Sequence, residues 1–211
     1  MQATMKRRVE IKICGLTSVD DARAALDLGA DYLGFVLFPK SPRYVTVSAL
    51  AAILDKLPHP CRAVGVFVNE PRRVVDSVAA ACGLYAVQLH GDERAGEFSD
   101  MPLPVWRAVW FRGKAWTPPA ADWAVDRYVI DAAAAGEYGG SGVSADWKRA
   151  AAFAKAHRVM LAGGLTADNV AKAIRAVNPA GVDVVSGVEA KPGKKSLKKL
   201  EAFIRKVRSN E

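Results

Sequence analysis

Cysteine is scarce in this sequence of 211 residues, with three copies at positions 14, 61 and 82. The odd number, and the lack of any CxxC pair or His/Cys cluster, argue against a disulfide framework and against a zinc site. No apolar run approaches the roughly 18 residues that a membrane span needs. The first ten residues carry charge without an apolar stretch, so no signal peptide is predicted. We therefore expect a cytoplasmic protein with no metal and no membrane contact.

Signatures of nucleic-acid binding are also missing, although the chain is basic. The sequence has 30 Lys and Arg against 22 Asp and Glu, for a formal charge of +8. Part of this excess lies near the two ends, at 6–8 and among Lys194, Lys195, Lys198 and Lys199. Without a basic-aromatic repeat, zinc-finger spacing or helix–turn–helix pattern, we expect these terminal charges to be solvated surface. A net positive charge also favours the steering of small anions.

Eight short, apolar and β-branched runs alternate with amphipathic stretches along the whole chain. The eight predicted strands cover residues 10–16, 32–37, 61–68, 86–91, 105–111, 126–131, 158–164 and 181–187. This alternation is typical of repeated βα units around a parallel sheet. No linker or low-complexity segment divides the chain, so a single domain over residues 1–211 is predicted.

Helices are predicted between the strands from their caps and apolar periodicity. The segment 18–29 opens with Ser18 as N-cap and closes at Gly29, and the segment 166–179 starts with Thr166 and stops before a proline. The last predicted helix, 196–209, presents one apolar face, formed by Leu197, Leu200, Phe203, Ile204 and Val207. Adjacent prolines in 112–124 predict a short or missing fifth helix.

Eight such units favour a closed (β/α)8 barrel over an open doubly wound sheet. The first strand is followed by CGLTS and not by GxGxxG, so a dinucleotide-binding sheet lacks its fingerprint. In (β/α)8 barrels, catalytic groups come from the carboxyl ends of the strands and from the loops that follow. Polar residues at those ends are therefore the candidates for catalytic roles.

Several strands carry polar side chains where valine and isoleucine would be ordinary. Side chains two apart share one face of a strand, so Lys12 lies on the same face as Cys14, and Gln88 on the same face as His90. Asp131 ends the sixth predicted strand, and Asp183 lies in the eighth. If these faces point inward, the mouth of the barrel holds a thiol, an ammonium, an imidazole and two carboxylates.

Cys14 and Asp131 each have a structural and a chemical interpretation. A buried cysteine is usually an inert small hydrophobe, and Cys61 and Cys82 fit that description. Cys14 differs because it shares a face with Lys12, and a nearby cation would favour the thiolate, which acts as a base. Asp131 is either a structural carboxylate or, in a desolvated mouth, an acid with a raised pKa that donates a proton.

Charged and glycine-rich loops around the predicted mouth suggest an anionic ligand. Arg43 follows the second strand, where its guanidinium is either an exposed surface group or a clamp for a carboxylate. GGSG (139–142), AGGL (162–165) and SGVEA (186–190) follow the last three strands. The last two turns lie where barrels commonly hold a phosphate on backbone N–H groups.

Taken in order, these segments resemble the phosphoribosylanthranilate isomerase family of tryptophan biosynthesis. The resemblance runs from KICGLT (12–17) to GVEAKPGKK (187–195). It is carried by KICG, GADYLGFVLFPKSPRYV, VGVFVNE, VQLHGDE, EYGGSG, LAGGLTADNV and VDVVSGVEAKPGKK. Their length and order make chance matching implausible. The one departure is AAAAGEY (132–138), which differs in length and composition from many relatives.

The resemblance implies a phosphate-binding (β/α)8 barrel and an Amadori rearrangement without cofactor or metal. N-(5′-phosphoribosyl)anthranilate would become 1-(2-carboxyphenylamino)-1-deoxyribulose 5-phosphate. Cys14 would be the general base and Asp131 the general acid. The substrate-binding residues implied by the family are Arg43, His90, Asp183, Gly163, Gly164, Ser186 and Gly187. The expected partner is this small phosphorylated substrate, with the chain a monomer or a homodimer.

Two other functions stay open at this stage. Another phosphosugar barrel enzyme of tryptophan or histidine synthesis would need a lysine–glutamate constellation or two aspartates in place of Cys14 and Asp131. A non-catalytic barrel that senses or carries a phosphorylated ligand would keep Arg43 and the glycine turns without needing the thiol and the acid together.

Overall fold

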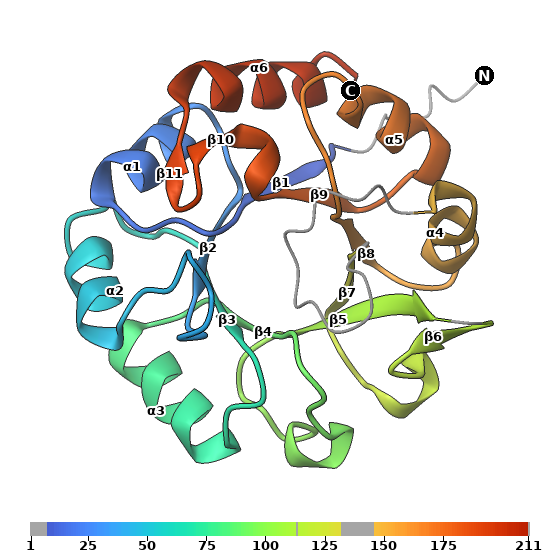
Figure 1. Cartoon of the computed structure of the whole chain (residues 1–211). Coiled ribbons are helices and arrows are strands. Elements are labelled where there is room, and N and C mark those ends of the chain that lie inside the picture. Colours follow the sequence, from blue (N-terminus) through green and yellow to red (C-terminus); the bar gives the residue numbers. More distant parts are fainter. Residues whose placement is uncertain (1–7, 113, 132–145, 211) are drawn as a thin grey trace.

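The computed structural model of the chain describes residues 8–112, 114–131 and 146–210. Eight parallel strands form a ring in chain order, and the pairing of β9 with β1 closes it (Figure 1). The strands of the ring are β1 (Glu10–Ile13), β2 (Tyr32–Val36), β3 (Ala63–Phe67), β4 (Ala86–Leu89), β5 (Val105–Arg112), β7 (Arg127–Ile130), β8 (Val159–Leu161) and β9 (Gly181–Val184). Each lies within one of the eight predicted runs or extends it by one residue, and the (β/α)8 prediction is confirmed.

Helices form the outer layer around this ring (Figure 1). They are α1 (Val19–Asp27), α2 (Val47–Leu54), α3 (Arg72–Cys82), α4 (Trp147–Ala154), α5 (Val170–Val177) and α6 (Leu197–Arg208). In the described part of the chain, none of them has the length and apolarity to cross a bilayer.

The described residues 114–126, between β5 and β7, form no α-helix, which agrees with the prediction of a short or missing fifth helix. Between β5 and β7 the chain forms a short antiparallel strand, β6 (Ala115–Thr117), and a 3-10 turn, η2 (Ala120–Asp122). The described residues 90–104, between β4 and β5, also form no α-helix and contain the 3-10 turn η1 (Ala95–Glu97), a feature that no sequence pattern predicted.

Two details of the predicted helices are wrong. Thr166 does not start α5, because Asn169 accepts a bond from its amide and donates to the Gly164 carbonyl, which makes a separate turn before the helix. Leu197 does not belong to the apolar face of α6, since it is 62% exposed at the first position of the helix. The remaining residues predicted for that face are buried.

The alternation of side chains along the strands creates two separate apolar layers. Side chains that point inward fill the barrel with a compact cluster formed by Tyr32, Val64, Ala86, Trp106, Val129, Met160 and Ala162. Side chains that point outward, such as Ile11 and Ile13 of β1, pack in the larger core beneath the helices. Because inward positions near the carboxyl ends of the strands are not filled by this cluster, space remains there for a ligand.

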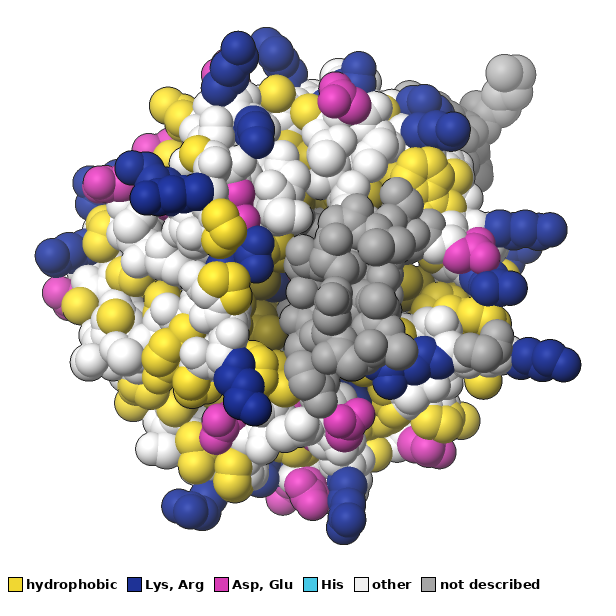
Figure 2. All heavy atoms as spheres, in the orientation of Figure 1, with side chains coloured by type: hydrophobic (Ala, Val, Ile, Leu, Met, Phe, Trp, Pro, Cys, Tyr) yellow, Lys and Arg dark blue, Asp and Glu magenta, His cyan; other side chains and the backbone are white. Residues whose placement is uncertain are grey.

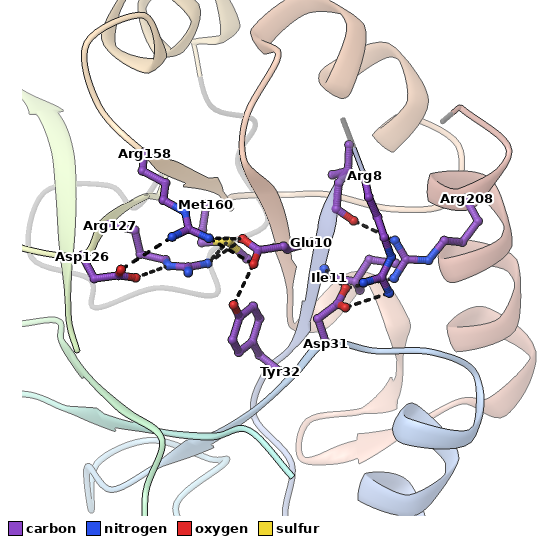
Figure 3. A network of polar contacts seen from close by, with 11 residues as sticks. Arg8, Glu10, Ile11, Asp31, Tyr32, Asp126, Arg127, Arg158, Met160 and Arg208 are labelled. Atoms are coloured by element: carbon purple, nitrogen blue, oxygen red, sulfur yellow. Dashed lines mark hydrogen bonds and ion pairs between the residues drawn. The ribbon is translucent and has the colours of Figure 1, made fainter. Parts of the chain in front are cut away.

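The amino ends of the strands are closed by a buried ionic network (Figure 3). The Arg127 guanidinium is 1% exposed and bonds Glu10 at 2.8 Å and Asp126 at 2.7 Å. Its carbon lies 4.3 Å from the Trp106 ring centroid, directly beneath the inner cluster. Tyr32 adds a 2.8 Å bond to Glu10. This end of the barrel is therefore sealed, which leaves the opposite end for chemistry.

Candidate active site

One cavity of about 490 Å³ lies at the carboxyl ends of the strands. It is lined by Cys14, Val36, Phe38, Lys40, Ser41, Pro42, Arg43, Val66, Val68, Gln88, His90, Asp131, Ala162, Gly163, Gly164, Leu165, Asp183, Val185, Ser186 and Gly187. All nine residues predicted from the sequence to contact substrate border this single cavity. Its size and its mixture of apolar walls with a few convergent polar groups are typical of a small-molecule site. Lys and Arg side chains project around the periphery of the face in Figure 2.

Cys14 follows β1 and points into the barrel, where it is 4% exposed. Room for its sulfur comes from Gly34 of the neighbouring strand β2, because a Cβ there would lie 2.5 Å from Cys14 Sγ and 2.9 Å from Lys12 Cε. Real side chains do not approach so closely, so a glycine at 34 is a condition for the position of the thiol. No sequence pattern predicted this role of Gly34, although the residue lies in one of the segments that resemble the family.

Lys12 lowers the pKa of the Cys14 thiol, as the sequence predicts, but other groups around the thiol oppose this effect. Burial raises the pKa of the Cys14 thiol; Lys12 lowers it, but Asp183 raises it further and the net direction is upward. The Lys12 ammonium is completely buried and bonds Asp183 Oδ2 at 2.8 Å, so its charge is compensated by this carboxylate. Burial lowers the pKa of Lys12, yet Asp183 and Cys14 outweigh this and leave it raised.

A row of polar side chains crosses the floor of the cavity from β1 to the end of β7. Lys12 Nζ donates to Gln88 Oε1 at 2.9 Å, and Gln88 Nε2 lies 2.9 Å from His90 Nδ1. His90 Nε2 in turn faces Asp131 Oδ2 at 3.5 Å. The predicted pairs Lys12/Cys14 and Gln88/His90 do share inward faces, and the row connects them to the carboxylate at the end of β7.

Arg43 borders the cavity, but its guanidinium is already engaged. Nε and Nη2 donate to the two carboxylate oxygens of Glu189 at 2.8 Å each. These bonds raise the pKa of Arg43 above its ordinary value. Burial raises the pKa of Glu189, but Arg43 and Lys195 outweigh burial and hold it below the usual range. Glu189 therefore holds Nε and Nη2 of the guanidinium that was predicted to bind a carboxylate, and Nη1 is the nitrogen without a bond to Glu189.

Lys195 corrects the prediction that the basic residues near the end of the chain are all solvated. It is 4% exposed, and its ammonium donates to the Cys14 carbonyl at 2.6 Å, to Val185 O at 3.1 Å and to Glu189 at 3.2 Å. Burial is the main cause that lowers its pKa. Lys195 thus ties the backbone of the thiol residue to the carboxylate that holds Arg43. Its position in a run of lysines concealed this role in the sequence.

The two glycine turns after β8 and β9 lie against each other at one side of the cavity. Gly163 and Gly164 have φ of 82° and 63°, a region that favours glycine. A Cβ on Gly187 would overlap the Leu165 carbonyl, so the short 3-10 turn η3 (Ser186–Val188) packs directly on the preceding loop. Backbone amides gathered in this way are suited to a phosphate. Two features of the sequence lie outside the described residues. They are the third predicted glycine turn, 139–142, and the segment 132–138, which differs from the family pattern.

Nothing in the described part of the chain forms a group of three or more His, Cys, Asp or Glu side chains that could hold a metal ion. The polar side chains that line the cavity include the thiol of Cys14, the imidazole of His90, the carboxylates of Asp131 and Asp183, and the cationic groups of Lys40 and Arg43. Asp183 Oδ1 and His90 Nε2 are buried without a hydrogen-bond partner among the described residues. Such atoms at a cavity wall are suited to bind the polar groups of a ligand.

Fold and site together define a (β/α)8-barrel protein with a thiol, two carboxyl groups and two glycine turns around one cavity. The sequence model of the N-(5′-phosphoribosyl)anthranilate (PRA) isomerase family matches residues 11–206. The N-(5′-phosphoribosyl)anthranilate isomerase of Pelobacter propionicus is 46% identical over 197 residues, which cover 93% of this chain and 94% of that protein. The chain therefore belongs to the phosphoribosylanthranilate isomerase family and is an enzyme of the isomerase class.

Solved structures agree with this assignment. The phosphoribosyl anthranilate isomerase of Thermus thermophilus is 34% identical, with a TM-score of 0.86 over 96% of this chain and 100% of that one. Another phosphoribosyl anthranilate isomerase was solved with reduced 1-(o-carboxyphenylamino)-1-deoxyribulose 5-phosphate. It is 33% identical to this chain, with a TM-score of 0.80 over 95% of this chain and 99% of that one.

Proposed function

We propose that this chain converts N-(5′-phosphoribosyl)anthranilate into 1-(2-carboxyphenylamino)-1-deoxyribulose 5-phosphate for tryptophan synthesis, with Asp131 as general acid and Cys14 as general base. The observation that carries these roles is the meeting of both side chains in one cavity, from the ends of β7 and β1. The related structure that holds the reduced product supports the choice of ligand. A carrier of phosphorylated ligands would have no need for this pair.

The reaction starts with proton transfer to the ribose ring. Asp131 gives its proton to the ring oxygen, the C1–O bond breaks, and the nitrogen lone pair forms a C1=N iminium. The iminium acidifies the C2 proton, which the Cys14 thiolate removes. The electrons of the C2–H bond form a C1=C2 enolamine, and the nitrogen regains its lone pair. Addition of a proton to C1 and loss of the proton from the C2 hydroxyl then give the ketone at C2. The substrate nitrogen is the electron sink, so this chemistry requires no cofactor.

The remaining residues of the cavity bind and orient the substrate in this proposal. The backbone of Gly163, Gly164, Ser186 and Gly187 receives the phosphate. Arg43, fixed by Glu189, binds the anthranilate carboxylate through its remaining donors. Asp183 Oδ1, which lacks a protein partner among the described residues, accepts a bond from a sugar hydroxyl.

A fluorescence assay of the anthranilate group tests this function, because emission changes when the aminoaldose rearranges. We expect the wild-type chain to convert the substrate, and Cys14→Ala and Asp131→Asn each to lower kcat at least about a hundredfold. Circular dichroism and binding of the reduced product provide the controls for folding and for an intact cavity. Binding of that product without any conversion by the wild type would instead establish a carrier.

We propose that residues 1–211 act as one domain in the cytoplasm, which fits the three free cysteines at 14, 61 and 82. The state of assembly, monomer or homodimer, stays a prediction that sedimentation analysis tests.

A further inference from the structure

Two buried side chains, Gln88 and Lys12, continue the polar row from His90 towards β1. Lys12 Nζ, Gln88 and His90 form an unbroken row of hydrogen bonds of 2.9 Å each along the inner faces of β1 and β4. Every member is buried, with exposures of 0% for Lys12, 2% for Gln88 and 6% for His90. In such a row, each group determines whether the next group must donate or accept the hydrogen bond between them.

Lys12 fixes the orientation of the Gln88 amide. An ammonium has only donors, so the atom of the amide that faces Lys12 must be the oxygen. The other atom, which faces the imidazole, must then be the NH₂ group, again a donor. The positive charge of Lys12 therefore determines which atom of the Gln88 amide is the oxygen and which is the nitrogen.

Gln88 in turn fixes the tautomer of His90. A donor at 2.9 Å requires that Nδ1 be an acceptor, and therefore that it carry no proton. The neutral ring then has its proton on Nε2. The doubly protonated ring is disfavoured, since its Nδ1–H would face the NH₂ group of Gln88.

His90 Nε2 lies beside the carboxyl group of Asp131, the proposed acid. It lies 3.5 Å from Asp131 Oδ2 and has no hydrogen-bond partner among the described residues. From the neighbouring strand β5, Trp110 packs edge-on against the ring at 5.5 Å. A charged imidazolium at this place would favour the ionised carboxylate and weaken Asp131 as an acid. A neutral donor avoids this, yet still binds the carboxylate that appears when the proton leaves.

We infer that Lys12 and Gln88 are positioning residues that hold His90 as the neutral Nε2–H tautomer, whose proton binds the carboxylate that Asp131 becomes. This inference rests on the proposed function in one respect, the role of Asp131 as acid. The tautomer itself follows from the row of side chains alone. The two parts are therefore measured separately.

Nitrogen NMR of the imidazole measures the tautomer without turnover. The chain has three histidines, and loss of one signal set in His90→Asn assigns the ring. In ¹⁵N-histidine-labelled wild type at neutral pH, we expect Nδ1 to have the shift of an unprotonated ring nitrogen and Nε2 that of a protonated one. A protonated Nδ1, alone or together with Nε2, would overturn the inference whether or not the protein converts substrate.

Gln88→Glu is the matched variant because it keeps the size of the side chain and replaces the donor by an acceptor. We expect the Nδ1 signal to become that of a protonated nitrogen, and kcat to fall roughly a hundredfold with little change in KM. A merely structural role would leave the His90 signals unchanged, and that result contradicts the inference. Gln88→Met is the second variant if the glutamate does not fold, and it is expected to give a mixture of both tautomers.

Discussion

The guanidinium of Arg43 and the carboxylate of Glu189, 146 residues apart in the chain, form a two-pronged ion pair with both bonds at 2.8 Å. Glu189 also accepts from Lys195, whose ammonium holds the Cys14 carbonyl. A single carboxylate therefore links the proposed substrate-binding arginine to the backbone of the proposed base. The Glu189 carboxylate thus helps to position both the proposed binding residue Arg43 and the proposed base Cys14.

Replacement of Glu189 by glutamine tests that link. The change keeps the shape but leaves the partly buried Arg43 and the buried Lys195 without their carboxylate, and breaking a buried ion pair typically costs about 3–5 kcal/mol of stability. We expect the free energy of unfolding to fall in this range and KM to rise, because Arg43 loses its fixed orientation. Denaturant titration and steady-state kinetics measure the two effects. Unchanged stability and KM would show that Arg43 is held by other contacts.

The same pair predicts how stability depends on acid. The pKa of Glu189 is lower in the folded chain than in the unfolded chain. Its contribution is therefore complete above the ordinary pKa of a glutamate and is lost as the pH falls through the lower, folded value. Unfolding curves at a series of acidic pH values should show a smaller loss of stability in Glu189→Gln than in the wild type. Parallel curves would contradict this assignment.

Gly34 provides a test of the space around the thiol. An alanine methyl group there would lie 2.5 Å from Cys14 Sγ, so the thiol must move. We expect Gly34→Ala to lower kcat at least about tenfold and to cost about 1–3 kcal/mol of stability. Gly96→Ala is the matched control, since no atom lies within 4 Å of its added methyl group. Equal kcat in the two variants would mean that the position of the sulfur is not critical.

The ionisation of Cys14 predicts a pH profile. Burial and Asp183 raise the pKa of the thiol above its ordinary value despite Lys12. Alkylation of Cys14 by iodoacetamide, followed by mass spectrometry, should therefore increase with pH around a midpoint above that of a free cysteine. A folded pKa that is higher than the unfolded one also means that stability falls as the pH rises from the unfolded towards the folded value. A midpoint below that of free cysteine would contradict the prediction.

The sealed end of the barrel should affect stability without affecting catalysis. Glu10 accepts from the buried Arg127 and from Tyr32, far from the cavity at the opposite ends of the strands (Figure 3). We expect Glu10→Gln to lower the free energy of unfolding by about 3 kcal/mol, since it leaves a buried guanidinium without this partner. The fluorescence assay should give an unchanged kcat. A large loss of kcat in a fully folded variant would show that the two ends are coupled.

The sequence was sufficient to predict the barrel and most of the cavity because both depend on local patterns. Alternating apolar runs mark the strands, and the polar residue at a strand end stands out, as Asp131 does in YVID. The carboxyl ends of parallel strands meet at one end of the barrel, so Cys14 and Asp131 come together without any knowledge of their distance.

Other parts of the site depend on contacts that no local pattern contains. Lys195 looks like a surface lysine in a basic run, and only the fold brings it to the Cys14 carbonyl, 181 residues away. The opposing effect of Asp183 on the pKa of the Cys14 thiol also depends on the fold, since this residue bonds Lys12 from the neighbouring strand β9. Leu197 has an apolar side chain at the right spacing, but it lies in the first turn of α6 and is exposed.

The pairing of β1 with β9 has a consequence for synthesis on the ribosome. The first strand hydrogen-bonds one of its two edges to the last, from Glu10↔Gly181 to Ile13↔Val184. While a nascent chain still lacks residues 181–184, that edge has no partner, and an unpaired strand edge is a template for association with other chains. Ring closure is thus a late event during translation, and the interval before it is the time at which this protein most needs protection from aggregation.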